Sequence, residues 1–156
     1  MSDEPVSLRI SESVRVEIAA IALRTKRSFS SVVNEMLEED LKMRRVRGIY
    51  FGDEFNRREA KVGGTGLGVW EVIETYQSMN GDWEDFRAYY DWLNEFQLRE
   101  ALDYYAAYPE EIDARIQDNR HWTPEKLYAT YPFMRPPWIS DSPESEELSE
   151  HVAPER

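Results

Sequence analysis

The chain has 156 residues, a formal net charge of −12 and no cysteine. This length suits one medium domain or two small ones, the acidic balance excludes a uniformly nucleic-acid-binding surface, and the lack of cysteine excludes disulfides and thiolate metal sites. We recognise neither a signal peptide nor an apolar run long enough to span a bilayer, so we expect a cytoplasmic protein with no membrane partner.

The first element in chain order is a short alternating stretch, residues 6–11. Successive side chains of a strand point to opposite sides, so a strand here would be apolar on one face and polar on the other. The polar face would carry Ser7, Arg9 and Ser11. This pattern predicts a strand whose polar side chains can form hydrogen bonds with bases.

Two amphipathic helices are predicted directly after this strand. Apolar residues recur at helical spacing from Glu12 to about Thr25, and Ser11 is the expected N-cap residue. A second helix follows Phe29, with Ser30 as its expected N-cap. A strand and two helices of this size bury too little surface to be stable alone. We therefore expect a homodimer.

In a dimer, the two strands would form a two-stranded ribbon of a size that enters the DNA major groove. The segments VSLRIS, ESVRVEIAAIALRTKRS and FSSVVNEMLEEDLKMRR, in this order, resemble the ribbon-helix-helix repressors of the Arc, MetJ and CopG type. The resemblance implies that Ser7, Arg9 and Ser11 face the groove. It also implies that Ser30 and Ser31, at the start of the second helix, bind a DNA phosphate, which the free N–H groups of a helix N-terminus suit.

An ordinary dimerising helical hairpin with an edge strand is the alternative interpretation of this stretch. Arg9 argues against it, because one exposed arginine between two serines is what base readout would use, and one bidentate contact discriminates between bases by about 1 to 3 kcal/mol. One dimer would then be weakly selective, so we expect tandem dimers. The family often carries a glycine before its second helix, where this chain has Arg27 and Ser28.

Charge is distributed unevenly along the chain. Residues 1–47 carry 9 basic and 8 acidic side chains, residues 48–118 carry 6 and 16, and residues 119–156 carry 4 and 7. Only the first segment can approach DNA without strong repulsion. Lys26 and Arg27, between the two helices, are expected to add DNA contacts there.

The second segment, residues 48–118, begins with two short strand patterns over residues 49–51 and 60–62, which predict a small β-hairpin. The glycine-rich residues 63–68 lack the lysine and the serine or threonine of a phosphate-binding P-loop. We interpret these glycines as a turn.

Helical patterns follow, over residues 69–79, then after the cap residue Asp82, then, after a break near residues 92–93, over residues 94–108, and finally from Pro109. Asn94 and Gln97 have the spacing of a capping box, and the side chains expected to face inward after it are Leu98, Ala101, Leu102 and Tyr105.

Several short helices after a hairpin are typical of a compact domain like a winged helix-turn-helix. The helix over residues 94–108 is expected to expose Glu95, Glu100 and Asp103 against only Arg99, so phosphates would be repelled. We interpret this domain as a protein-binding surface.

A second resemblance covers about residues 49–117. The segments KVGGTGLGVWEVIETY and DWEDFRAYYDWLNEFQLREALDYYAAYPEEID look like the small antitoxin-associated domain called domain of unknown function 433. Members usually have a basic residue after Gly-Thr and a proline two residues later, where this chain has Gly66 and Gly68. A ribbon-helix-helix domain followed by this domain is similar to the antitoxin half of a type II toxin-antitoxin pair. That similarity implies operator DNA and a cognate toxin, commonly a PIN-like ribonuclease, as partners.

The tail, residues 119–156, has many prolines and no sustained period. Thr123 is expected to cap a short helix, the remainder to be extended, and residues 141–156 to be disordered. The tail has too many large apolar side chains for a solvated segment, so it either folds back on the second domain or orders on a partner. In an antitoxin it would occlude the nuclease active site, with Arg135 pairing with metal-binding carboxylates. The candidate toxin-binding residues are Trp122, Tyr128, Tyr131, Phe133, Arg135 and Trp138.

An enzyme interpretation would rest on the clustered carboxylates Asp82, Glu84, Asp85 and Asp91, since such groups can hold Mg²⁺. No lysine, histidine or serine stands near them in a catalytic pattern, so we interpret them as a solvated helix face. We expect no catalytic residue, no metal site and no cofactor.

The expected fold is mainly α: a ribbon-helix-helix (β-α-α) domain, residues 1–47, a winged helix-turn-helix-like domain with a short β-hairpin, residues 48–118, and an extended tail, residues 119–156. The expected function is that of an antitoxin that neutralises a nuclease toxin and represses its own operon. Two alternatives stay open: a stand-alone transcriptional regulator with an acidic protein-binding domain, and, less favoured, a metal-dependent nuclease.

Overall fold

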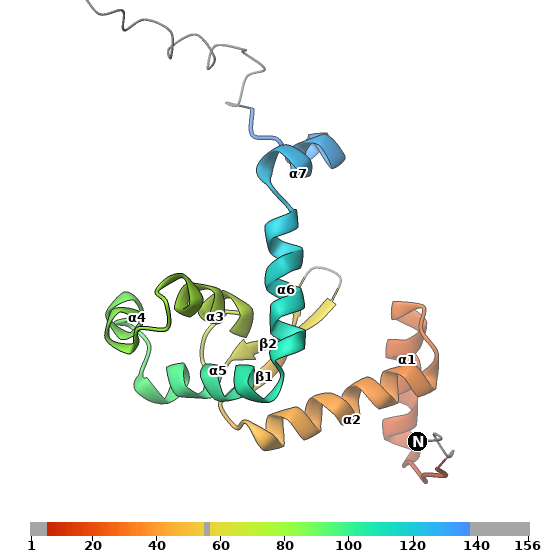
Figure 1. Ribbon diagram of the computed structural model, residues 1–156. Coiled ribbons are helices and arrows are strands. Elements are labelled where there is room, and N and C mark those ends of the chain that lie inside the picture. The colour runs from red at the N-terminus through yellow and green to blue at the C-terminus, as the bar shows by residue number, and fades with distance from the viewer. Residues whose placement is uncertain (1–5, 55–56, 138–156) are drawn as a thin grey trace, which may run out of the picture. The chain divides into compact units, whose positions relative to one another are not determined.

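A computed structural model describes residues 6–54 and 57–137 (Figure 1). The described chain is mainly helical with one two-stranded antiparallel sheet, which confirms the coarse fold class. The chain divides into two units, Met1–Ile116 and Gln117–Arg156, and each is described by itself. The predicted toxin contact Trp138 and the segment 141–156 lie outside the described residues.

The two predicted N-terminal helices are present as α1 (Glu12–Thr25) and α2 (Phe29–Arg45), and they pack on each other. Ser11 is the N-cap residue of α1, as predicted, although its side chain forms no capping hydrogen bond. The predicted cap of α2 is wrong. Ser28, and not Ser30, holds that position, and its hydroxyl accepts a hydrogen bond from the Ser31 N–H at 3.1 Å.

The wrong cap has a conformational cause in the turn between the helices. Lys26 closes α1 in the left-handed region, with φ of 54°, and its backbone N–H donates to the Leu23 carbonyl. Only two residues then separate it from Phe29, the first residue of α2. Ser28 and Ser30 both suit a cap chemically, so this short turn determines which of them takes the position.

Residues 6–11 form no strand in the single chain. They precede α1, and among the described residues the hairpin β1–β2 is the sole sheet. The predicted strand is therefore absent here. A strand needs a neighbour to satisfy its backbone N–H and C=O groups, and the described part of this chain offers none to this segment.

The predicted hairpin is confirmed and is longer than expected. β1 (Ile49–Glu54) pairs antiparallel with β2 (Arg57–Val62), with Ile49 opposite Val62. The glycine-rich segment that follows is a turn, as predicted: the Val62 N–H donates to the Leu67 carbonyl, and the Gly63 N–H donates to the Gly48 carbonyl at 2.7 Å. This turn directs the chain from β2 into the next helix.

Four helices complete the first unit and confirm the helical predictions: α3 (Val69–Ser78), α4 (Trp83–Tyr89), α5 (Glu95–Ala107) and α6 (Pro109–His121), the last of which ends in the second unit. Asp82 caps α4, and Asn94 and Gln97 form the predicted capping box of α5. α3 and α5 both pack against the hairpin. The largest fully buried side chains of this core are Tyr104, Phe86, Ile73 and Leu98.

Charged side chains tie α2 to the hairpin and to the later helices. Arg58 of β2 donates to both carboxylate oxygens of Glu39 of α2, at 2.7 and 2.9 Å, and Glu39 is buried. The Gly48 N–H donates to Glu100 at 2.7 Å. Glu100 is therefore partly buried and engaged, which corrects the expectation that it is exposed on α5.

The described part of the second unit is short. α7 (Pro124–Thr130) begins after Thr123, whose hydroxyl accepts from the Lys126 N–H at 3.4 Å, as predicted. A single 3₁₀ turn, η1 (Pro132–Met134), follows. The expectation that the chain is extended after the short helix is wrong at η1, where the Met134 N–H donates to the Tyr131 carbonyl.

Candidate functional site

The N-terminal module, residues 6–47, buries few of its apolar side chains. Ile18, Ala22 and Val32 are buried between α1 and α2. Several other large apolar residues stay in contact with solvent, among them Val6 (88% exposed), Leu23 (82%), Leu8 (67%), Leu41 (66%) and Leu37 (51%). None of these five side chains belongs to, or packs against, either buried cluster of the described chain, so the module leaves this apolar surface without a packing partner there.

The three predicted base readers lie together in sequence but not on a strand face. Ser7, Arg9 and Ser11 are all exposed in the segment before α1. The Ser11 hydroxyl lies 3.3 Å from the Ser13 hydroxyl. In the single chain nothing fixes the direction of the Arg9 guanidinium, because no hydrogen bond or ion pair within the described residues holds it.

The predicted phosphate site at the start of α2 is partly occupied by the chain itself. Ser30 is exposed, but the Ser31 N–H is taken by Ser28, and the Ser31 hydroxyl accepts from Arg27 at 2.9 Å. Arg27 also pairs with Glu35 at 2.7 Å. Lys26 is exposed and forms no ion pair within the described part of the chain. Of the two predicted basic contacts, Lys26 is thus the one available to a ligand.

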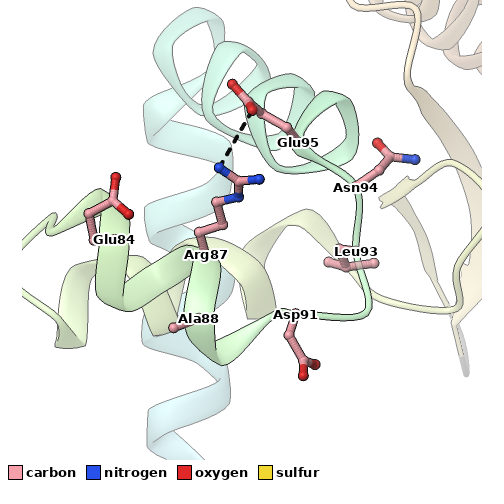
Figure 2. A pocket seen from close by; sticks show the side chains of 7 residues that line it. All are labelled: Glu84, Arg87, Ala88, Asp91, Leu93, Asn94 and Glu95. Carbon is pink, nitrogen blue, oxygen red and sulfur yellow. Dashed lines mark ion pairs between the residues drawn. The ribbon is translucent and has the colours of Figure 1, made fainter.

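A hollow of about 530 Å³ lies between α4 and the start of α5 (Figure 2). Sequence reasoning did not find it, because it depends on how two helices meet. Arg87 reaches across to Glu95, with 3.9 Å between Nη1 and Oε2, and Arg99 contacts the same carboxylate at 2.6 Å. The hydrogen bond from Arg99 holds the pKa of Glu95 below its usual value. The hollow is lined by Glu84, Arg87, Ala88, Asp91, Leu93, Asn94 and Glu95.

The carboxylates considered for a metal site do not form a cluster that could hold a metal ion in the described chain. Asp82 accepts the Asp85 N–H as the cap of α4, and Glu84 and Asp91 line the hollow. Within residues 6–54 and 57–137, no group of three or more histidine, aspartate or glutamate side chains is arranged to hold a metal ion.

The second unit carries three aromatic side chains in a row, which we call the aromatic strip: Trp122, Tyr131 and Phe133. The rings of Trp122 and Tyr131 lie 6.1 Å apart and those of Tyr131 and Phe133 6.0 Å apart, between centroids. All three are exposed, Phe133 by 83%. The other predicted toxin contacts of this unit, Tyr128 and Arg135, are partly buried.

Comparison of the chain with protein-family models, with curated proteins and with solved structures gives no match in any of the three. In the described part of the chain, no helix has the length and apolar character that crossing a membrane requires. What the chain binds is therefore inferred from the chemistry of its own surfaces.

Proposed function

We propose that this chain is a homodimeric DNA-binding repressor that also acts as the antitoxin of a nuclease toxin. The observation that carries this proposal is the unpartnered apolar face of the N-terminal module. Burying apolar surface is worth roughly 25 cal/mol per Å², and Leu8, Leu23, Leu37 and Leu41 leave most of theirs in water. A second copy of the same module would cover these side chains.

Dimerisation would also supply the missing strand. Residues 6–11 of two copies, lying antiparallel, would satisfy each other's backbone groups and form the ribbon that the sequence pattern predicts. Arg9 would then stand on the ribbon's outer face between Ser7 and Ser11. The exposed Lys26 and the N-terminus of α2 near Ser30 would contact the DNA backbone, since a helix N-terminus favours an anion.

The antitoxin part of the proposal is supported by the aromatic strip. Exposed aromatic side chains at this density are typical of protein-binding surfaces, and the strip lies in a separate unit, away from the proposed DNA-binding module in sequence. The hairpin and α3–α5 would form the winged helix-turn-helix-like second domain. Its acidic surface favours a protein partner over DNA.

The dimer is tested with Leu37→Glu, which places a charge on the exposed apolar surface of α2, and with Ala106→Glu, an exposed position of α5 outside the N-terminal module, as control. We expect light scattering to show a dimer for the unchanged chain and for Ala106→Glu, and a monomer for Leu37→Glu that no longer binds DNA. A dimer that persists in Leu37→Glu would contradict the proposed interface.

The antitoxin role is tested by co-expression with the product of the adjacent gene. We expect that product to stop growth when expressed alone, and the full chain to restore growth and co-purify with it. Phe133→Ser should reduce rescue without affecting the dimer. If the adjacent product is harmless or does not bind, the chain is a stand-alone repressor. Mg²⁺-dependent cleavage of nucleic acid by this chain alone would instead support the nuclease.

A further inference from the structure

Three aromatic side chains meet at the end of α4, and we call them the α4 aromatic patch: Tyr89, Tyr90 and Trp92. The rings of Tyr89 and Tyr90 lie 4.9 Å apart and those of Tyr90 and Trp92 6.1 Å apart, between centroids. Tyr90 is buried, whereas Tyr89 and Trp92 each leave 61% of their surface exposed. The rings of Tyr89 and Trp92 therefore pack edge to face with the buried ring of Tyr90 and are themselves exposed to solvent.

The surroundings of this patch are strongly acidic. Residues 82–95 contain five acidic side chains and one basic one, Arg87. Arg87 and the nearby Arg99 are both directed to Glu95. Glu84, Asp85 and Asp91 form no ion pair within the described residues. In Figure 2 the carboxylate of Asp91, the neighbour of Trp92, points away from the Arg87–Glu95 pair.

Two other tryptophans of this unit show what such surroundings accommodate. The Arg99 guanidinium lies 4.8 Å from the Trp83 ring and is held by Glu95 at 2.6 Å. The Arg115 guanidinium lies 4.3 Å from the Trp70 ring and is held by Glu59 at 3.1 Å. In both cases an arginine is stacked on a tryptophan and paired with a glutamate.

Trp92 has an exposed ring and is preceded in sequence by the carboxylate of Asp91, but it lacks the arginine. Among the described residues no lysine or arginine lies over its ring, and Asp91 directly precedes it. A planar guanidinium stacks on an aromatic face and donates to a carboxylate in one geometry, whereas an ammonium group is a compact, more strongly hydrated charge. The empty position therefore favours arginine over lysine.

We infer that the α4 aromatic patch binds an arginine side chain from a basic segment of a partner protein. Trp92 and Tyr89 supply the stacking surface, and Asp91 supplies the counter-charge. The acidic residues around the hollow attract the remaining positive charges of the segment. This site goes beyond the proposed function, because it uses neither the N-terminal module nor the aromatic strip.

The probe is a pair of uncharged-capped peptides of about nine residues, one of arginine and one of lysine, titrated calorimetrically into the full chain at about 150 mM salt, where weak surface attraction is screened. We expect the arginine peptide to bind about fivefold more tightly than the lysine peptide, the size of one exposed stacking contact. Trp92→Ala should abolish this preference, and Asp91→Asn should weaken binding of both peptides.

Two variants serve as matched controls. Phe96→Ala removes another aromatic side chain of similar exposure, and Asp103→Asn removes another exposed carboxylate, both on α5. Both should leave the preference for arginine unchanged. Circular dichroism and thermal unfolding check the fold of every variant. We expect the fold to be retained, because each of the replaced side chains is exposed.

Three outcomes would overturn the inference: no binding of either peptide, equal affinity for both in the unchanged chain, or the same loss of preference in Trp92→Ala and Phe96→Ala. The titration contains neither DNA nor the adjacent gene product. Its failure would therefore leave the proposed repressor and antitoxin roles standing, and failure of those roles would leave this site standing.

Discussion

The Nζ of Lys42 lies 2.5 Å from Oε2 of Glu111, so a side chain of α2 is paired with one of α6 across 69 positions of sequence. The other oxygen of Glu111 accepts a hydrogen bond from the buried hydroxyl of Tyr104 at 2.8 Å. Burial, and then this bond to a carboxylate, raise the pKa of Tyr104. One acidic side chain thus joins α2, α5 and α6, and we expect α2 to unfold together with the helices that follow it.

Replacing Glu111 by alanine should test this connection. The change leaves the Tyr104 hydroxyl buried without its acceptor and Lys42 without its counter-charge, and we expect the free energy of unfolding to fall by about 2 kcal/mol. Glu110→Ala, an exposed neighbour on the same helix turn, should change it by no more than about 0.5 kcal/mol. Urea denaturation followed by circular dichroism measures both, and equal effects would argue against the connection.

The glycine-rich turn offers a matched pair of substitutions. A Cβ at Gly63 would lie 2.7 Å from the Gly48 carbonyl oxygen, a backbone atom that cannot easily move, whereas a Cβ at Gly66 would meet no atom within 4 Å. We expect Gly63→Ala to destabilise the chain by about 2 kcal/mol and Gly66→Ala to change its stability by less than about 0.5 kcal/mol. The two thermal unfolding midpoints decide this, and a neutral Gly63→Ala would show that the turn can shift.

The proposed DNA contacts predict two different binding phenotypes. Arg9→Ala should remove base readout and reduce discrimination between operator and scrambled DNA by about 1 to 3 kcal/mol. Lys26→Ala should weaken binding to both DNAs alike and reduce the slope of log affinity against log salt by about 1. Fluorescence anisotropy at several salt concentrations distinguishes the two. Arg15→Ala, whose side chain pairs with Glu12, is the control and should do neither.

The hollow predicts a pH effect centred on Glu95. The hydrogen bond from Arg99 lowers the pKa of Glu95, so the ionised carboxylate is favoured in the folded chain. The stability that this pair contributes is fully present above the unfolded-state pKa, near 4.3 for a glutamate (roughly), and is lost as the pH falls through the lower folded-state value. An NMR titration of the Glu95 carboxyl carbon should show its pKa rise in Arg99→Gln. An unchanged value would mean that another group sets it.

Local signals predicted much of the fold, because they depend on residues near one another in sequence. Asp82 at the start of α4 and the reciprocal pair Asn94 and Gln97 at the start of α5 are caps whose donors lie three residues away. The choice between Ser28 and Ser30 could not be made in the same way, since both residues suit the cap and the left-handed turn at Lys26 decides it.

Contacts that are distant in sequence escaped prediction. Tyr104 is fully buried, although the helical pattern of α5 placed Leu102 and Tyr105 inward, and both of these are only partly buried. Glu39 is buried, and the ion pair with Arg58 on β2 compensates the cost of burying its charge. Such pairs depend on how α2, the hairpin and α6 meet, which no single periodic pattern records.

The candidate sites likewise differ in how far local sequence signals predicted them. The apolar residues that α1 and α2 leave exposed follow from the sequence pattern, whereas the strand predicted over residues 6–11 is absent and stays a prediction for the proposed dimer. The segment around Trp92 was expected only to be a break between helices. Leu93 is buried, whereas its neighbour Trp92 is exposed, and this difference leaves the Trp92 ring of the α4 aromatic patch in contact with solvent.

Lys26 occupies a backbone position that a glycine would hold with less strain, since a left-handed conformation costs a side-chain-bearing residue about 1 kcal/mol. The chain accepts that penalty at the corner between its first two helices and gains a positive charge there that none of its described carboxylates neutralises. A positive charge at the C-terminus of a helix offsets part of that penalty, because it interacts favourably with the helix dipole. In the proposed dimer this charge would be present twice, at two symmetry-related corners.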